Sequence, residues 1–322
     1  MRQDILEYLL EHRGEFVSGQ KLSDVLGITR TAVWKHICTL REKGYVVESF
    51  TKKGYRLTGV PELLDADAVS VSLHTKSIGR TIVYRERADS TNTLAKELAD
   101  KGAAEGTVVA AEEQSGGKGR LERSFYSPYA KGLWFSVILR PPFPPIEVSK
   151  ITLLAAVAVT RTLHQFGLAG CVIKWPNDLL VNGKKIVGIL TELSATMEQV
   201  GYVVLGIGIN TTVTLDEMPE EIRAGATSFA AEGIIVSRNE LWRAVMESLE
   251  KYYEKAKKEG FSSILDEWRI LSSTLGKTVE VTLPRETLIG RAVDIDGDGN
   301  LLVMSEKGME RVVAGDVRVR TK

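Results

Sequence analysis

Three glycines and three cations lie within ten residues, from Gln114 to Arg123, between two apolar segments with strand-like sequence. Glycines let backbone N–H groups curl around an anion, and Lys118, Arg120 and Arg123 would neutralise the charge that accumulates when a phosphoanhydride is attacked. Solvated turns and nucleic-acid-binding patches share this composition. The segment is not a P-loop, because no Gly-Lys-Ser/Thr follows at the required spacing. It predicts a phosphate-binding loop of another kind, with a solvated turn as the alternative.

Another cation, Lys174, ends an apolar strand where Pro176 forces the chain to turn. Because Ile173 and Trp175 flank it, its ammonium group is partly desolvated and seeks an anionic partner such as a carboxylate or a phosphate. The alternative is a lysine whose charge simply reaches solvent at a strand end. Lys174 is therefore a candidate for the same chemistry as the loop.

Small polar side chains lie at a further junction, where Ser90, Thr91 and Asn92 follow a strand-like segment, 81–85, and precede a helical one, 94–99. They either cap that helix or present hydrogen-bonding groups to a small polar ligand. The residues alone leave both interpretations open.

The central region supplies the elements that must position these groups. Trp134 and Phe135 point to opposite faces of a strand, so one is expected in the core and the other at a pocket. Gly188, Gly206 and Gly208 lie in buried strands, where glycine indicates that another group approaches the backbone. The strands are expected at 81–85, 108–112, 133–139, 184–192 and 202–210, with a hairpin turn at Asn182-Gly183, and the helices at 150–166, 239–258 and 261–271.

The first sixty residues have the pattern of a winged helix. Apolar residues recur at helical spacing in three short stretches. Gly27 allows a tight turn between the second and third helices, and Thr29 can cap the third. Two alternating segments, Tyr45 to Phe50 and Tyr55 to Leu57, follow as strands of the wing.

The outer face of the third helix is polar and basic, in a chain whose net charge is zero. Such a face fits a DNA major groove, and Arg41, Lys43, Lys52 and Lys53 lie near enough in sequence to contact phosphates. A winged module that binds only protein is the alternative. We expect DNA contacts, with Trp34 on the same face, from Thr29, Arg30, Thr31, Ala32, Lys35 and His36.

Short alternating strands with glycine-rich turns end the chain, at 278–283, 289–295, 301–305, 310–313 and 317–320. Their number and length predict a small SH3-like barrel. The segment Asp294 to Gly299 imitates the start of a calcium loop, but Ser305 stands where the bidentate glutamate is required. A hairpin turn is therefore expected there.

Composition sets the limits for the whole chain. At 322 residues with 43% apolar content, it has room for two or three domains with their own cores. Cys38 and Cys171 match no metal or redox spacing, and we expect neutral thiols and no resident metal. The most apolar run, Ile151 to Val159, is too short to span a bilayer, and no signal-peptide core follows Met1. These features favour a cytoplasmic protein without a membrane partner.

The loop at 114–123, Lys174-Trp175-Pro176-Asn177-Asp178 and Gly206-Ile207-Gly208-Ile209-Asn210 together closely resemble bacterial biotin protein ligases. With the winged helix in front, the resemblance is to bifunctional members that also repress the biotin operon. It covers essentially the full chain. It implies an α+β multidomain fold: a winged helix-turn-helix domain (1–60), a class II synthetase-like mixed α/β ligase domain (65–271) and a C-terminal SH3-like β-barrel (274–322).

The resemblance also implies the reaction and its partners. Biotin and ATP, bound with Mg²⁺, give biotinyl-5′-AMP and pyrophosphate, and a lysine of a biotin carboxyl carrier protein then takes the biotin. The adenylate would also act as corepressor for a homodimer that binds the biotin operator. The implied catalytic residues are Lys174 and Arg120. Biotin would contact Ser90, Thr91, Asn92, Gln114, Lys118, Gly119, Arg120 and Lys174, and the adenylate Gly117, Trp134, Lys185, Gly188 and Asn210.

The loop departs from the family pattern Gly-Arg-Gly-Arg-x-Gly-Arg. Lys118 replaces the first arginine and lacks its bidentate fork, and Glu122 replaces the last glycine and adds a negative charge. Phe125 stands where many members have tryptophan. We hypothesise a functional ligase that holds its intermediate with altered affinity.

Alternatives remain open. One is a lipoate-type ligase with an appended DNA-binding module. The other is a ligand-sensing repressor whose ligase centre has decayed. Glu122 keeps this alternative open, whereas Lys174, Arg120 and the run Ser90-Thr91-Asn92 oppose it.

Overall fold

The computed structural model describes residues 2–42, 45–59, 62–64, 73–196, 200–283 and 286–319. The residues up to Leu63 form one compact unit, and most of the remaining chain forms another. The sequence predicts a hinge from Gly59 to Glu62 and a short helix from Asp65 to Ser72. Residues 60–61 and 65–72 lie outside the described residues, so part of the hinge and the whole helix are not described.

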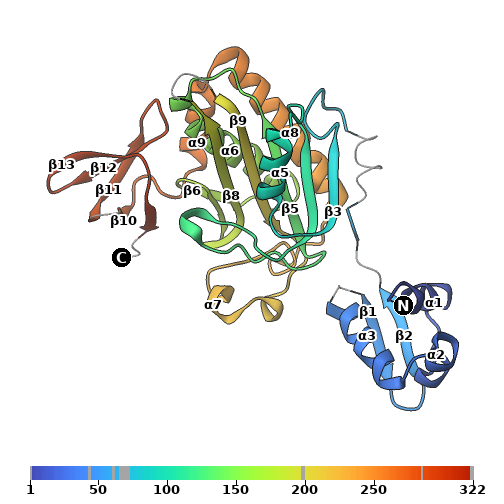
Figure 1. Ribbon diagram of the computed structural model, residues 1–322. Coiled ribbons are helices and arrows are strands. Elements are labelled where there is room, and N and C mark those ends of the chain that lie inside the picture. The colour runs from blue at the N-terminus through green and yellow to red at the C-terminus, as the bar shows by residue number, and fades with distance from the viewer. Residues whose placement is uncertain are drawn as a thin grey trace. The chain divides into compact units, whose positions relative to one another are not determined.

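The N-terminal unit is the expected winged helix (Figure 1). Helix α2 ends at Gly27, whose φ of 63° is left-handed, and Thr29 accepts a 3.2 Å hydrogen bond from the backbone N–H of Ala32 at the start of α3. Both predictions about the turn are confirmed. Ile5, Leu22 and Ile37 are fully buried in its core. The elements are α1 (Arg2–Glu11), α2 (Gly19–Leu26), α3 (Arg30–Glu42), β1 (Val46–Phe50) and β2 (Gly54–Gly59).

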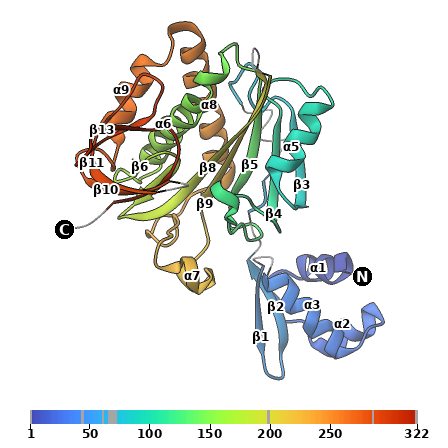
Figure 2. The same cartoon turned by 60° about the vertical axis from the view of Figure 1, so that its left-hand side comes forward.

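The second unit is built on a seven-stranded sheet with the order β3-β4-β5-β9-β8-β7-β6 (Figure 2). Among the described strands of this sheet, β3 and β4 pair in parallel and the other neighbours are antiparallel. Asn182 and Gly183 both have positive φ between β7 and β8, which confirms the hairpin turn. The strands are β3 (Ile82–Ala88), β4 (Val108–Gln114), β5 (Gly132–Leu139), β6 (Val172–Lys174), β7 (Asp178–Val181), β8 (Lys184–Ala195) and β9 (Val200–Asn210).

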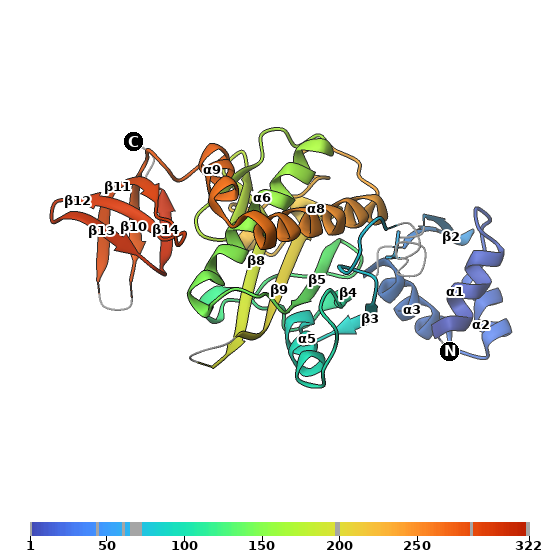
Figure 3. The same ribbon diagram turned by 90° about the horizontal axis from the view of Figure 1, so that it is seen from above.

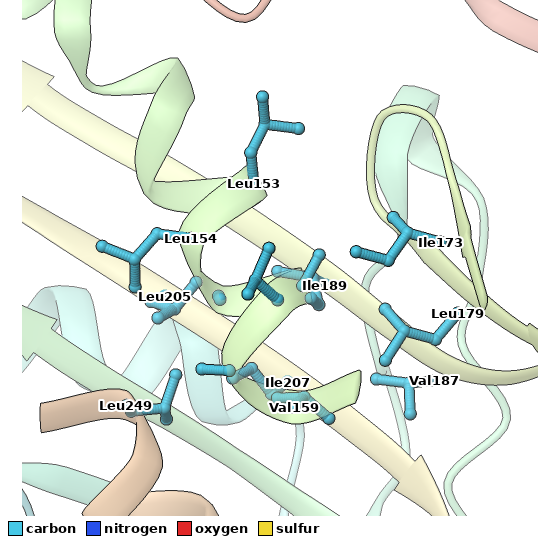
Figure 4. Packing of buried hydrophobic residues seen from close by; sticks show 14 of the residues in the cluster. Leu153, Leu154, Val159, Ile173, Leu179, Val187, Ile189, Leu205, Ile207 and Leu249 are labelled. Carbon is cyan, nitrogen blue, oxygen red and sulfur yellow. The ribbon is translucent and has the colours of Figure 1, made fainter. Parts of the chain in front are cut away.

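Helices cover both faces of this sheet (Figure 3). Successive residues of β4 point to opposite faces, so Val109 packs against α5 whereas Val108 joins the larger core beneath α6 and α8. Figure 4 shows that larger core, where Leu154, Leu205 and Leu249 come from three different elements. The helices are α5 (Thr91–Asp100), α6 (Ser149–Gln165), α8 (Arg238–Glu259) and α9 (Ser262–Leu271).

A buried ion pair fixes the two strands that flank the loop at 114–123. Arg238 of α8 donates 2.7 Å hydrogen bonds to the Glu112 carboxylate on β4 and to the Gly132 carbonyl on β5. Both charged side chains are at most 1% exposed. Removing one partner of such a pair costs about 3–5 kcal/mol, because the other charge stays buried.

The C-terminal strands form a five-stranded antiparallel sheet with the order β13-β12-β11-β10-β14. Among the described residues the ladders give this open order, so closure into an SH3-like barrel stays a prediction. The turn at 296–299 is a hairpin turn, as expected, in which Asp296 accepts hydrogen bonds from the backbone N–H groups of Asp298 and Asn300. The strands are β10 (Thr278–Thr282), β11 (Thr287–Ile295), β12 (Leu301–Ser305), β13 (Gly308–Val312) and β14 (Asp316–Val319).

Hydrogen bonds and an ion pair fasten this small sheet to the central domain. The indole N–H of Trp175 donates to the Gly299 carbonyl at 3.1 Å, and Lys150 of α6 donates to the Gly297 carbonyl at 3.3 Å. Arg269 of α9 forms a 2.7 Å ion pair with Asp294. The C-terminal sheet therefore has a fixed place beside α6 and β6.

Short elements in the loops were not predicted, because they lack enough turns to show a periodic pattern. They are η1 (Arg120–Glu122), η2 (Pro145–Glu147), η3 (Leu215–Glu217) and α7 (Glu220–Arg223). Burial raises the pKa of the Cys171 thiol to about 12, in agreement with the expected neutral thiol. In the described part of the chain, no helix combines the length and the apolar character needed to cross a bilayer.

Candidate active site

A pocket, which we call the central pocket, lies where the loop at 114–123, predicted to bind phosphate, meets the N-terminus of α5 and strands β8 and β9. It brings together most of the residues predicted from the sequence and adds several that were not. Its lining consists of Ser90, Thr91, Asn92, Gln114, Lys118, Gly119, Arg120, Phe125, Phe135, Asn177, Lys185, Gly188, Ile189, Leu190, Gly206, Ile207 and Gly208.

The polar base of the pocket is a connected hydrogen-bond network. The Gln114 side-chain carbonyl accepts from the backbone N–H and hydroxyl of Thr91, at 2.8 and 3.0 Å, and its amide donates to the hydroxyl of Ser127 at 2.9 Å. The buried hydroxyl of Ser136 lies 2.6 Å from the Asn92 side-chain oxygen. Ser90 caps α5, which confirms the capping interpretation of this junction; it also lines the pocket, where binding of a polar ligand stays a prediction. A network tied at so many points presents fixed donors and acceptors to a small polar ligand.

Asn92 is held against β9 because the neighbouring residue is glycine. A Cβ added at Gly206 would lie 2.0 Å from the Asn92 side-chain oxygen. The Asn92 amide in turn donates to Glu192 at 2.8 Å, and Lys96 pairs with the same carboxylate. Burial raises the pKa of Glu192, but the hydrogen bonds from Lys96 and Asn92 lower it more, and the net direction is down.

Phe125 forms one wall of the pocket, over two glycines. A Cβ at Gly208 would lie 2.4 Å from its ring, and one at Gly188 would lie 2.7 Å away. The ammonium group of Lys185 lies 5.5 Å from the ring centroid. The close approach predicted from these glycines is therefore that of an aromatic ring.

The cations of the loop are directed by neighbours on different elements. Lys118 donates to the Thr93 hydroxyl on α5 at 2.9 Å. Arg120 donates to the Gly315 carbonyl at 3.2 Å and reaches the Asn177 side-chain oxygen at 3.5 Å. Burial lowers the pKa of Arg120, an effect that Asp178 and Asp316 partly offset. The guanidinium group is thus positioned in the pocket wall and partly desolvated, where a ligand anion would interact with it strongly.

Lys174 ends β6 between fully buried Ile173 and Trp175, which is 2% exposed, and is itself half-buried, as expected. It does not line the central pocket. In the β6–β7 ladder it lies opposite Asp178, which forms a 2.6 Å ion pair with Lys185. Lys174 therefore stands beside the charged edge of the pocket rather than inside it.

A neighbouring pocket, the loop pocket, contains the predicted Asn210. The Asn210 amide donates to the Thr227 carbonyl at 2.8 Å. Phe125 and Lys185 line both pockets, so a ligand that occupied both would pass these side chains. The remaining lining is Ser124, Tyr126, Val213, Met218, Glu221, Ile222, Gly225 and Ala226.

Two predicted adenylate contacts lie elsewhere. Trp134 is fully buried behind Phe125, at 5.8 Å between ring centroids, and donates to the Pro128 carbonyl; Phe135 lines the pocket instead. Gly117 lines neither pocket. A Cβ on it would lie 2.4 Å from the Phe125 carbonyl, so it allows the loop to fold back on itself.

Sequence reasoning missed several lining residues. Asn177 follows Lys174 within the quoted motif and was available as a polar residue after a strand. Ile189 and Leu190 were assigned to a buried strand without a reason to separate pocket from core. The residues from Val213 to Ala226 carry no periodic signal, so nothing local indicated that this segment would line a pocket.

The winged helix presents the expected face. Thr29, Arg30, Thr31, Trp34 and Lys35 are exposed, whereas Ala32 and His36 are half-buried. Arg30, Thr31 and Trp34 line a concavity together with Lys52 of the wing.

Arg41, predicted to contact phosphates, has partners within the winged helix, and its contact with DNA stays a prediction. Its guanidinium group donates to the Val47 carbonyl at 2.6 and 2.8 Å and to the Ser49 hydroxyl at 2.5 Å, and it therefore anchors the wing. Lys43 lies outside the described residues.

Family models match along most of the chain. They are a helix-turn-helix domain over residues 1–56, the biotin/lipoate A/B protein ligase family over residues 84–210, and the biotin protein ligase C-terminal domain over residues 274–320.

Individual relatives agree with these models. The bifunctional ligase/repressor BirA of Bacillus spizizenii is 39% identical over 99% of this chain and 98% of its own length. BirA of Escherichia coli is 29% identical over 96% and 94%. The structure of the Aquifex aeolicus biotin protein ligase in complex with biotin and ATP aligns with a TM-score of 0.66 and 27% identity, over 76% of this chain and 100% of that one. This chain therefore belongs to the biotin protein ligase family, in its bifunctional ligase/repressor branch.

Proposed function

We propose that this protein is an ATP-dependent biotin protein ligase that also represses transcription of biotin genes. The observation that carries the ligase assignment is the central pocket itself. A network of hydrogen-bonded hydroxyl and amide groups around Thr91, Asn92 and Gln114 lines it, together with the cations Arg120 and Lys185. Polar groups of this kind suit a ureido ring, and the cations suit a carboxylate and a phosphate.

In the first step, a carboxylate oxygen of biotin attacks the α-phosphorus of MgATP. The bond to the leaving pyrophosphate breaks, and biotinyl-5′-AMP remains. Arg120 and Lys174 would stabilise the negative charge that develops on the α-phosphate oxygens. We assign biotin to the central pocket, with Ser90, Lys118 and Gly119 completing its contacts.

We assign the nucleotide part of the adenylate to the loop pocket, with contacts from Lys185, Gly188 and Asn210. Phe125 and Lys185 line both pockets and would flank the phosphate. Trp134 and Gly117 would act indirectly, Trp134 by supporting the Phe125 ring and Gly117 by shaping the loop.

In the second step, the neutral ε-amine of a carrier-protein lysine attacks the acyl carbon of the adenylate. An amide bond forms, AMP leaves with the former bonding electrons, and the amine loses a proton. A cleft between the central domain and the C-terminal sheet shares Arg120, Asn177 and Leu190 with the central pocket and extends to Asn300 and Val313. This cleft would admit the extended lysine side chain.

The winged helix would bind the biotin operator through the face that carries Thr29, Arg30, Thr31 and Lys35, flanked by Ala32 and His36. We propose that the adenylate is the corepressor and favours a homodimer on DNA, which couples operator affinity to biotin supply. The reaction needs ATP and a carrier protein, which the cytoplasm provides.

Biotin-dependent exchange of radiolabelled pyrophosphate into ATP tests the assignment directly. The wild-type protein should catalyse exchange with biotin, and Lys174→Ala should lose most of it. Exchange with lipoate alone would favour the lipoate-type ligase. No exchange with either acid would favour a repressor with a decayed ligase centre.

A further inference from the structure

The phosphate-binding loop is fastened at both ends of its basic segment. Near its start, Lys118 donates to Thr93 on α5, within the central domain. Near its end, Arg123 forms a 2.6 Å ion pair with Asp316, the first residue of β14. The loop is therefore held between the central domain and the C-terminal sheet.

A second contact joins the same two segments. Arg120 donates to the carbonyl of Gly315, the residue before Asp316, at 3.2 Å. Two arginines of the loop thus bind two successive residues, Gly315 and Asp316, at the start of β14. The Arg123 side chain is 63% exposed, as in a surface ion pair, but its partner Asp316 is only 24% exposed. The ion pair is therefore partly shielded from solvent.

Asp316 has a fixed position. It pairs with Thr282 in the β10–β14 ladder. The segment before β10 is joined to β6, where Ser273 donates its backbone N–H to the Ile173 carbonyl at 2.8 Å. The Asp316 carboxylate is therefore held by strands that are hydrogen-bonded, through Ser273, to the strand that ends at Lys174.

Its charge also faces the reactive cations. Burial raises the pKa of Asp316, but the hydrogen bond and charge of Arg123, together with Lys174 and Arg318, lower it more. The charge of Asp316 also acts on Arg120. The carboxylate is thus ionised at neutral pH and lies among the cations assigned to the α-phosphate.

We infer that Asp316 of the C-terminal domain is a positioning residue for the ligase reaction, which clasps the phosphate-binding loop over the adenylate through Arg123. It touches neither substrate. It holds the loop conformation in which Arg120 lines the central pocket, so that the C-terminal sheet takes part in retaining the intermediate. This inference rests on the proposed function, because the intermediate is the one formed by a biotin ligase.

The experiment measures release of preformed biotinyl-adenylate in a chase with unlabelled biotin and ATP. Asp316→Asn should release it about fivefold faster, equivalent to about 1 kcal/mol at 25 °C, which is the upper range for an exposed ion pair. Arg123→Gln should behave in the same way, and the double variant should be no faster than either single one. The matched control is Glu286→Gln, which removes the carboxylate of an exposed pair with Lys307 in the same domain.

Limited trypsin digestion gives a second readout that does not need activity. Cleavage after Arg120 and Arg123 should be faster in Asp316→Asn than in the wild-type protein, and unchanged in Glu286→Gln. Wild-type release and cleavage rates in Asp316→Asn, or additive effects in the double variant, would overturn the clasp. A wild-type protein that forms no adenylate would instead refute the proposed function, while the digestion would still test the clasp.

Discussion

Replacing Glu122 with glycine should slow the release of the adenylate intermediate. Glu122 stands where the family pattern has glycine, and its φ is +58°; Leu121 before it has a φ of +54°. Both are left-handed conformations, in which an L-residue places its Cβ too close to the following carbonyl oxygen. The loop therefore reaches its clasped conformation only by placing two successive side chains in an unfavourable backbone region.

The magnitude follows from that conformation. A non-glycine residue in the left-handed region costs about 1 kcal/mol, whereas glycine carries no such cost. Glycine also gives the released loop more conformational freedom, which offsets the gain by about 0.4 kcal/mol. The remaining gain of about 0.6 kcal/mol corresponds to about a threefold slower release. Removing the carboxylate near a phosphate acts in the same direction.

The assay is the chase of bound biotinyl-adenylate from purified protein. Glu122→Gln removes the charge but keeps the Cβ, so it isolates the electrostatic part of the effect. Leu121→Gly relieves the same kind of backbone conformation at a side chain that is 68% exposed, without any change in charge. We expect Leu121→Gly to resemble Glu122→Gly, and Glu122→Gln to lie nearer to the wild-type rate.

Equal release rates in wild-type protein and Glu122→Gly would mean that the left-handed backbone carries no cost in the closed loop, and the predicted gain from glycine would be wrong. Faster release would show that the loop gains more from stiffness than it loses to strain.

Other predictions concern the rest of the molecule. Gly206→Ala should displace the Asn92 amide, because a Cβ would lie 2.0 Å from its oxygen, and should weaken biotin binding by about tenfold in isothermal titration. Glu192→Gln should lose about 1 kcal/mol of unfolding free energy in urea titrations at pH 7, since it weakens the bonds from Lys96 and Asn92. The pKa of Glu192 is lower in the folded protein than its ordinary value of about 4.3. The difference in unfolding free energy between wild type and variant should therefore be constant above about pH 4.3 and should shrink as the pH falls through the lowered pKa. A difference that grew on acidification would be inconsistent with this linkage. Arg30→Ala should reduce operator affinity in gel-shift assays while pyrophosphate exchange stays at the wild-type rate, and a parallel loss of both would contradict separate sites.

The sequence predicted the helices and strands well where a segment was long enough to show a hydrophobic period. The apolar stripes around Ile5, Leu22 and Val33 predicted the helices of the winged helix. The strand-like segments of the central region predicted strands of the seven-stranded sheet, among them β4, which ends at Gln114. The ends of elements differed by a few residues, because capping and ladder pairing decide them rather than periodicity.

Long-range contacts could not be predicted in the same way. The pairing of Arg123 with Asp316 joins residues that lie far apart in the sequence, and no local pattern indicates it. The family resemblance implied that Trp134 contacts the adenylate, yet Phe135 lines the pocket and Trp134 is fully buried behind Phe125. A strand alternates faces regardless of which aromatic residue is the larger.

The intact mass of a biotin carboxyl carrier protein, taken after incubation with this protein, biotin and MgATP, shows directly whether this protein transfers biotin. One biotinyl group should be added to the acceptor lysine, the addition should require both biotin and ATP, and Lys174→Ala should abolish most of it. A carrier protein of unchanged mass in the presence of the wild-type protein and both substrates would rule out biotin ligase activity.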